Sequence, residues 1–402
     1  MTTELLRPEM QVDFPRFSAA EYDRRYAAIR QAMAARNIDA LIVWGESSGW
    51  GELSGARTGM ASARYLSNFA DQLMEYVLLM RDGVPTLFTF SRSHSTCARG
   101  LSVVPIEFAH VDIALAVAER IRAARLQCGN IGLVGLSTIL GQSLPSDQMA
   151  LLHKELPDAK FSVVTELLEA VRVIKADEEL EWIGRAARHT DDAIAAVALA
   201  RPGLMEYELH AEVCRAYLPQ GGHLNFQALA ATPMERPALR SPGYHKSLRR
   251  FAEGDVILAE ISAGYWGYAG YVAQPVAIGV PAEGYRECFE IARRGLEVIE
   301  SALAPGADLA QVGAAFNSVL PASWTNASPL VRGWGLSIEP PYLGPDGKTA
   351  SPEKLADRMV VAVSVNPISP DGKIGLRVGE LFRIGPAGPV RLQSTPREFR
   401  HV

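Results

Sequence analysis

The segment from Gly254 to Gly279 is predicted to form a hairpin of two strands joined by an aromatic, glycine-rich turn. Its first strand is an apolar run that carries one charged side chain, Glu260, and its second strand runs from Val272 to Ile278. A carboxylate inside a buried strand costs free energy unless another group binds it. This hairpin is therefore the first candidate for a functional site.

The length and composition fit a folded protein of two domains. A chain of 402 residues exceeds the usual size of one domain. With 48% hydrophobic and 21% charged residues, the chain can bury a large core. The formal net charge of -5 supplies no basic stripe, so we expect no nucleic-acid partner.

The cysteines and the apolar segments favour a cytoplasmic location. Cys97, Cys128, Cys214 and Cys288 are scattered and form no CxxC pair, so we expect reduced thiols and no disulfide framework or zinc site. The N-terminal segment has no apolar stretch preceded by basic residues, which predicts no signal peptide. No apolar run approaches the roughly 20 residues that span a membrane, so we expect no membrane partner.

Residues 1–168 are predicted to form an α/β domain with a mixed sheet covered by helices. Ser18 is expected to cap the first helix, and Glu21 completes a capping box. Predicted helices cover residues 19–36, 111–126 and 146–155, and predicted strands cover 40–44, 74–80, 86–90, 130–134 and 161–164. The Gly- and Ser-rich segment from Glu46 to Ser62, which contains Trp50, is either a functional loop or a disordered surface loop.

Residues 169–402 form the second predicted domain. The segment from Val173 to Leu180 opens a long amphipathic helix, which ends at Arg201-Pro202-Gly203. A shorter helix and a polar loop lead to the hairpin described above. Helices are then predicted over 284–304 and 308–319, and the last strands over 359–365 and 375–384.

Short segments along nearly the whole chain follow a recognisable order. They are Phe17-Ser18 with Glu21-Tyr22, Asn37 to Leu41, Arg172 to Lys175 with Glu179, Glu253 to Val256, Gly267-Tyr268, Leu303 with Pro305-Gly306, and Met359 to Val361. In this order they resemble the creatinase, prolidase and aminopeptidase P superfamily. The resemblance implies an α/β (α+β) fold, in which a pita-bread C-terminal domain follows a creatinase-type N-terminal domain with a mixed sheet.

The resemblance also marks the positions that hold metal in the metallopeptidases of this fold. Those enzymes bind two metal ions with two Asp, one His and two Glu. The matching positions here are Glu260, Tyr271, the neighbourhood of Arg332, Ser364 (or Asn366 in a shifted register), and Gly379 after an Arg-x pair. A transition metal needs several converging N or O ligands, and an arginine opposes a bound cation. We therefore expect no metal and no other cofactor.

The superfamily has members that work without metal, and the chain resembles that branch. Ectoine hydrolase is thought to use a glutamate at the position of Glu260, and the catalytic His of creatinase falls on Gly243, close to His245. We expect an apolar environment to raise the pKa of Glu260, which can then act as base or nucleophile. The alternative is a structural salt bridge, with Arg332 as a partner.

Other residues of the predicted site have an equally plain structural alternative. His245 can shuttle a proton or be a solvated loop residue, and His223 is a competing histidine in what we expect to be a simple turn. Tyr271 can donate a hydrogen bond to developing negative charge or pack in the core. Arg332 can anchor a substrate carboxylate by a bidentate contact.

The remaining candidates are aromatic or acidic. Trp334 and Tyr268, with Tyr265 and Trp266, line a pocket for a cationic or planar substrate if they are not simply core residues. Glu339 falls where the family has a His-Glu-x-Pro pocket motif, and Glu380 lies beside a lost ligand position. Both are predicted to bind substrate.

Three functions follow as hypotheses. The first is a metal-independent hydrolase that acts on an amide, amidine or guanidine C–N bond of a small polar molecule. The second is a non-catalytic binding or scaffold protein on a retired peptidase fold, and the third is a metal-dependent Xaa-Pro dipeptidase. The resemblance also implies a homodimer, in which the loop from Glu46 to Ser62 reaches the partner's site.

Overall fold

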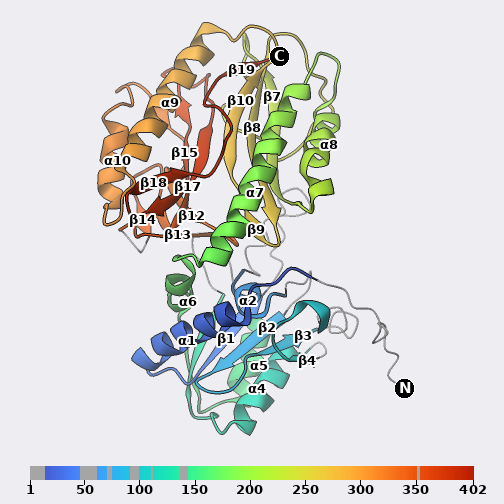
Figure 1. The fold of residues 1–402 in the computed structure, drawn as a ribbon, viewed down its shortest axis with the longest axis vertical. Helices are drawn as coiled ribbons and strands as arrows, with labels where there is room; N and C mark the ends of the chain where they lie inside the picture. The colour runs from blue at the N-terminus through green and yellow to red at the C-terminus, as the bar shows by residue number, and fades with distance from the viewer. Residues whose placement is uncertain are drawn as a thin grey trace. The chain divides into compact units, whose positions relative to one another are not determined.

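The computed structural model describes residues 14–45, 61–69, 75–90, 99–109, 112–135, 144–350 and 354–402 (Figure 1). Within them, the residues up to Arg172 form one compact unit and those from Val173 onward form a second. The predicted loop from Glu46 lies outside the described residues as far as Met60, and with it Trp50.

The first unit is a mixed sheet with helices around it, as predicted. Its strands follow the order β4-β3-β2-β1-β5-β6, with β1 antiparallel to β2 and parallel to β5. The strands are β1 (Ala40–Gly45), β2 (Glu75–Met80), β3 (Thr86–Thr89), β4 (Ile106–Phe108), β5 (Asn130–Val134) and β6 (Lys160–Val163). The helices are α1 (Ala19–Ala35), α2 (Ala61–Ser67), α4 (Ile113–Ala123), α5 (Ser146–Glu155) and α6 (Thr165–Arg172).

Local sequence signals account for most of these boundaries. The Ser18 hydroxyl accepts a hydrogen bond from the Glu21 backbone N–H at 3.2 Å, which caps α1 as predicted. The hairpin between β2 and β3 turns at Gly83, whose φ of 85° suits glycine. Helix α6 was not predicted, because its 8 residues make only about two turns, too few for a clear helical period.

The second unit is built on one large sheet. Its main path runs β14-β13-β12-β15-β17-β10-β8-β7, and β18, β19 and β9 pair with β17, β10 and β8 respectively. The strands are β7 (His223–Pro233), β8 (Asp255–Tyr265), β9 (Tyr268–Ala269), β10 (Val272–Ala277), β12 (Val331–Trp334), β13 (Ile338–Leu343), β14 (Thr349–Ala350), β15 (Val360–Val365), β17 (Val378–Gly385), β18 (Gly388–Arg391) and β19 (Arg400–His401), with β11 (Thr325–Asn326) and β16 (Pro367–Ile368) as a separate pair.

Two sets of helices cover this sheet and enclose separate cores. The helices are α7 (Asp177–Ala196), α8 (Glu206–Tyr217), α9 (Glu283–Ala302) and α10 (Leu309–Asn317), with 3-10 turns η2 (Val197–Leu199) and η3 (Leu218–Gln220). Helices α7 and α8 pack on β8 and β7, and α9 packs on β15 and β17 (Figure 1). Side chains of β8 alternate between the cores: Ile257 and Ala259 join the α7–α8 core, and Leu258 joins the α9–α10 core.

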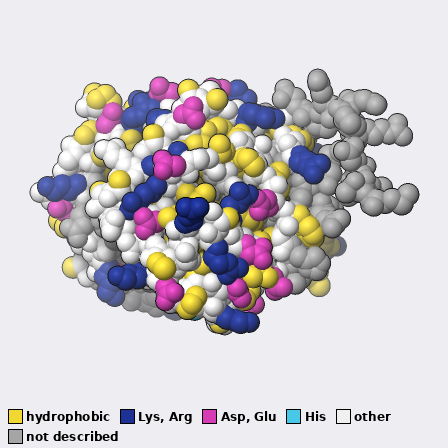
Figure 2. All heavy atoms as spheres, turned by 90° about the horizontal axis from the view of Figure 1, so that it is seen from below, with side chains coloured by type: hydrophobic (Ala, Val, Ile, Leu, Met, Phe, Trp, Pro, Cys, Tyr) yellow, Lys and Arg dark blue, Asp and Glu magenta, His cyan; other side chains and the backbone are white. Residues whose placement is uncertain are grey.

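Charges of both signs are mixed on the face of the molecule that Figure 2 shows. On the face in Figure 2, Lys and Arg side chains are mixed with Asp and Glu side chains and form no continuous basic region. None of the helices in the described ranges is long and apolar enough to cross a membrane.

Candidate active site

The predicted carboxylate Glu260 lies in the middle of β8, with Ala228 of β7 and Ala273 of β10 as its neighbours across the sheet. Its relative exposure is 0%. Small alanines on both sides leave room above the sheet for longer side chains from other strands. The strand interior therefore presents one buried acidic group, as the sequence predicts.

Three side chains bind the two oxygens of Glu260. The Tyr271 hydroxyl donates to Oε1 at 2.8 Å, and Nη2 of Arg332 donates to the same oxygen at 3.3 Å. Arg377 donates from Nη1 to Oε2. Tyr271 directly precedes β10, Arg332 belongs to β12 and Arg377 directly precedes β17, so four segments of the chain meet at one carboxylate.

The charges around Glu260 reverse the expected direction of its pKa. Burial raises the pKa of Glu260, but the positive charges of Arg377 and Arg332 and the hydrogen bond from Tyr271 outweigh burial and hold it below its ordinary value. The expectation of a raised pKa is therefore wrong, because it considered only the apolar neighbours within the strand. For Tyr271, burial and the charge of Glu260 both raise the pKa, so its hydroxyl keeps the proton.

The five positions matched to the family's metal ligands come together in the structure. Ser364 of β15 and Gly379 of β17 face each other in register. The Ser364 hydroxyl accepts from Nη2 of Arg332 at 3.4 Å and donates to the Pro329 carbonyl at 3.0 Å. A Cβ atom on Gly379 would lie 2.9 Å from the Tyr271 ring. The substituted positions thus form one cluster with Glu260.

This cluster does not fit the metal ions that the metallopeptidases of this fold bind. Both oxygens of Glu260 are engaged by arginines, and Gly379 offers no side chain. Two guanidinium groups lie where a cation would need negative ligands. Across the part of the chain that the structure describes, no group of three or more His, Cys, Asp or Glu side chains is placed to hold a metal ion.

Aromatic rings surround the charged cluster. The ring of Trp334 lies 5.1 Å from that of Tyr271, and the guanidinium carbon of Arg332 lies 4.9 Å and 5.4 Å from these two ring centres. Phe226 contacts both rings and also that of Tyr244. These contacts are in the range of cation–π and edge-to-face pairs. Trp334 therefore lies with Glu260, as predicted, and Phe226 and Tyr244 are additional members.

The structure does not bring the two histidines to Glu260. His245 is exposed, and no hydrogen bond or ion pair to it occurs among the described residues. His223 lies in β7 opposite Gly264. The loop that contains His245 does reach the cluster through Ser241, whose hydroxyl accepts from Nη2 of Arg377 at 3.3 Å.

Two further predicted site residues belong to other contacts. Glu339 is buried in β13 and forms an ion pair with the buried Lys175. The Tyr268 hydroxyl donates to Oε1 of Glu179 at 2.8 Å, and its ring packs edge-on against Trp182. Both residues tie the start of α7 to the sheet of the second unit.

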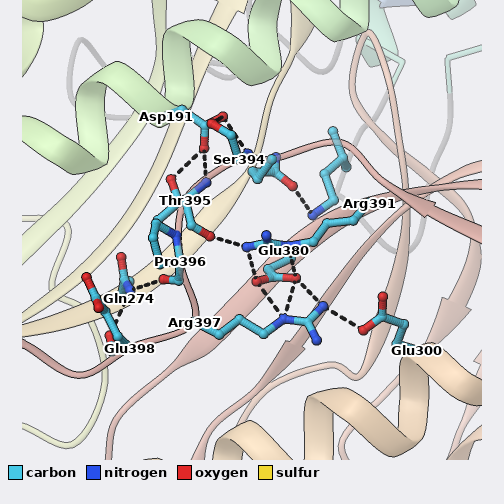
Figure 3. A network of polar contacts seen from close by, with 12 residues as sticks. Asp191, Gln274, Glu300, Glu380, Arg391, Ser394, Thr395, Pro396, Arg397 and Glu398 are labelled. Atoms are coloured by element: carbon cyan, nitrogen blue, oxygen red, sulfur yellow. Dashed lines mark hydrogen bonds and ion pairs between the residues drawn. The ribbon is translucent and has the colours of Figure 1, made fainter.

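Glu380 lies in a separate network, shown in Figure 3. It follows Gly379 in β17, so its side chain points to the opposite face of the strand. Its oxygens accept from Arg391 at 2.6 and 2.8 Å and from Arg397 at 2.6 to 3.0 Å. Arg397 also pairs with Glu300 at 2.6 Å. Glu380 therefore anchors the C-terminal segment.

Arg377 is the contact of Glu260 that the sequence analysis missed. In the sequence, Arg377 is the arginine of the Arg-x pair before Gly379, and that motif alone does not indicate a contact with Glu260. A usable signal was present, because Arg377 stands two residues before Gly379 and so shares its face of an extended strand, flanked by the apolar Leu376 and Val378. Phe226 and Ser241 carried no comparable signal.

Comparison with known proteins gives matches over both units of the chain. Residues 181–386 match the metallopeptidase family M24, and residues 25–174 match the creatinase/prolidase N-terminal domain. A Xaa-Pro dipeptidase of Pyrococcus horikoshii is 25% identical over 274 residues, which cover 64% of this chain and 73% of that protein. An uncharacterized hydrolase/peptidase, y4tL, of Sinorhizobium fredii is 25% identical over 392 residues, covering 95% and 97%.

Solved structures show the same fold. The crystal structure of an X-Pro aminopeptidase from Thermotoga maritima superposes with a TM-score of 0.77 at 21% identity, over 94% of this chain and 99% of that chain. The predicted α/β fold, with a creatinase-type N-terminal domain before a pita-bread domain, is confirmed. With more than half of its length matched, this chain belongs to metallopeptidase family M24, within the creatinase, prolidase and aminopeptidase P superfamily.

Proposed function

We propose that this chain is a metal-independent hydrolase that cleaves a C–N bond of a small polar molecule, with Glu260 as the reacting group. The bond is of the amide, amidine or guanidine type. The observation that carries the proposal is the convergence of Glu260, Tyr271 and Arg332 at positions where the family places metal ligands. The relatives named as dipeptidase and hydrolase/peptidase support the hydrolase class.

The charges favour a nucleophilic role for Glu260. Its lowered pKa keeps the carboxylate ionised at neutral pH, whereas a general base works best with a pKa near the working pH. In the proposed first step, a Glu260 oxygen bonds to the substrate carbon and the C–N bond breaks. Tyr271 gives its hydroxyl proton to the leaving nitrogen. Water then cleaves the mixed anhydride between Glu260 and the substrate acyl group (its C=N analogue for an amidine or guanidine), which frees the Glu260 carboxylate and returns a proton to Tyr271.

A non-catalytic binding protein is the second candidate. It is favoured by one observation, that both oxygens of Glu260 are already engaged by Tyr271, Arg332 and Arg377. The third candidate is a metal-dependent Xaa-Pro dipeptidase, and two relatives are named Xaa-Pro dipeptidase. That activity needs ligands that Tyr271 and Arg332 do not supply.

A substrate screen on metal-depleted protein separates the three candidates. The chelator-treated protein is incubated with small amides, amidines and guanidines and with Xaa-Pro dipeptides, with and without added Mn²⁺, Co²⁺ or Zn²⁺. Release of an amine or ammonia without added metal is expected. Activity that appears only with metal would establish the dipeptidase, and release from none of these compounds would favour the binding protein.

Glu260→Gln tests the role of the carboxylate, with Glu380→Gln as its matched control. Both glutamates are buried and each pairs with two arginines, so each change costs about 3–5 kcal/mol of stability. Only Glu260→Gln is expected to lower turnover, by at least about 10³-fold. Equal loss in both variants, once the folded fraction is measured by circular dichroism, would refute the mechanism.

A further inference from the structure

We infer that the cluster around Glu260 binds a small organic monocarboxylate. This names the substrate class of the proposed active site and rests on that proposal for its biological meaning.

The cluster carries one positive charge in excess. Arg332 and Arg377 share Glu260 as their acidic partner, and within the described ranges neither pairs with another carboxylate. Tyrosines near the pair are neutral at pH 7, because their hydroxyl groups ionise only near pH 10 or above. The side chains of Glu260, Arg332 and Arg377 are 0%, 9% and 12% exposed. A buried net charge is costly unless a counter-ion accompanies it.

The network of Glu380 shows how this chain balances a similar arrangement. There, too, one buried glutamate binds two arginines, Arg391 and Arg397. The second negative charge comes from Glu300, which pairs with Arg397 (Figure 3). No residue equivalent to Glu300 pairs with Arg332 or Arg377 among the described residues. The Glu260 cluster is therefore the one with a place for an external anion.

Three buried N–H donors of the cluster also lack an acceptor. They are Nε of Arg332, Nε of Arg377 and Nε1 of Trp334, none of which has a hydrogen-bond partner in the described structure. Buried donors are normally satisfied, and each unsatisfied one is costly. An acceptor-rich, negatively charged group would satisfy the charge and the donors together.

The size of the charge excess and the rings select among anions. One carboxylate neutralises the excess, whereas a phosphate dianion would leave the site negative. The fork of an arginine matches two carboxylate oxygens. Phe226 and Trp334 place apolar faces next to the guanidinium of Arg332, which suits an organic body on the anion. Tyr244, which packs on Phe226, is 38% exposed and marks the solvent side of the cluster.

Calorimetric titration of the whole chain at low salt tests the assignment with simple probes. Propionate and benzoate are compared with propionamide and benzamide, which have the same shapes without the charge, and with inorganic phosphate. We expect the acids to bind with one site per chain and at least tenfold tighter than their amides. Amides binding as well as acids, phosphate binding tightest, or no acid binding at millimolar concentration would overturn the inference.

Charge variants give the second arm of the test. Arg332→Gln and Arg377→Gln are expected to weaken benzoate binding at least tenfold. Arg383→Gln is the control and should leave binding unchanged: Arg383 belongs to β17 and also has a buried Nε without an acceptor in the described structure. Glu260→Gln raises the excess positive charge of the cluster from one to two. This variant should therefore bind benzoate more tightly than the unmodified chain while losing turnover. Unchanged binding in Arg377→Gln would contradict the inference even if the enzyme were active.

The carboxylate site and the proposed hydrolase activity can therefore be refuted independently of each other. A chain without turnover on any substrate, but with acid-selective binding, would refute the proposed hydrolase and keep the carboxylate site. Turnover without a preference for acids over amides would refute the carboxylate site and keep the proposed hydrolase. Melting curves of each arginine variant confirm folding, and the comparison of acids with amides on the unmodified chain needs no variant at all.

Discussion

At the residue scale, the behaviour of Glu260 depends on its partners more than on its burial. Glu260 and Glu380 are both buried glutamates in central strands, and each accepts from two arginines. Only the network of Glu380 includes a second carboxylate, Glu300. The same residue type in the same kind of strand therefore anchors a chain segment in one place and forms an unbalanced charged cluster in the other.

The lowered pKa of Glu260 predicts a specific pH dependence of stability. Because folding lowers this pKa, the contribution of the carboxylate is fully present above its unfolded pKa of about 4.3 and is lost as pH falls through the folded value. The difference in unfolding free energy between wild type and Glu260→Gln should therefore shrink below about pH 4. Urea unfolding between pH 3 and 7 measures it, and a difference independent of pH would contradict the assignment.

Tyr271→Phe removes the proposed proton donor. It should lower turnover about 10²-fold or more and cost about 1–3 kcal/mol of stability, since a buried oxygen of Glu260 loses a hydrogen bond. Tyr268→Phe is a close control, because its hydroxyl donates to Glu179 over the same 2.8 Å. Steady-state kinetics with a substrate from the screen measures the effect. Equal loss of turnover in both variants would assign Tyr271 a structural role only.

At the element scale, successive residues of one strand point to opposite faces of the sheet and so belong to different contacts. Gly379 faces the Glu260 cluster, and the next residue in β17, Glu380, faces the C-terminal network. In β8, Leu258 and Ile257 likewise enter different cores. The predicted strands placed Glu260, Ser364 and Gly379 correctly because a period of two needs no knowledge of the partner strand. Arg377 lies just outside its strand, where alternation gives a weaker signal.

Gly379→Ala tests how closely β17 approaches the cluster. A Cβ atom there would lie 2.9 Å from the Tyr271 ring and 2.8 Å from the Val363 carbonyl oxygen. We expect a loss of about 1–3 kcal/mol and a displaced tyrosine, seen as reduced benzoate affinity in the titration. Gly184→Ala in α7 meets nothing closer than 3.9 Å and should be neutral or stabilising. An unchanged free energy of unfolding in Gly379→Ala would show that β17 can shift to accommodate the added methyl group.

At the scale of the whole molecule, the chain has the fold of family M24, and the positions matched to the family's metal ligands carry other residue types. The sheet of the second unit still brings β8, β12, β15 and β17 together, and the residues it presents are Glu260, Arg332, Ser364 and Gly379. Family membership therefore fixes the backbone framework, and the chemistry follows from the side chains at a few positions.

Metal addition should leave this protein unchanged. Arg332 and Arg377 engage both oxygens of Glu260. Mn²⁺, Co²⁺ or Zn²⁺ should therefore neither raise the melting temperature nor bind stoichiometrically, because a stabilising metal would have to bind the folded state. Elemental analysis after gel filtration, beside differential scanning calorimetry, measures both. Two equivalents of retained metal and a raised melting temperature would instead support a metal-dependent peptidase.

The homodimer stays a prediction, which sedimentation equilibrium can check.

The sequence by itself determined the family, the order of the elements and which residue types stand at the positions matched to metal ligands, because these depend on local periodicity and on motifs read along the chain. Only the tertiary structure decided that Arg377 and Arg332 share Glu260, that Glu380 pairs with Arg391 and Arg397, and that the pKa of Glu260 falls. Those outcomes depend on distances between strands far apart in the sequence. Whether a carboxylate in a strand has apolar neighbours or two arginines beside it depends on which other strands of the sheet place side chains next to it.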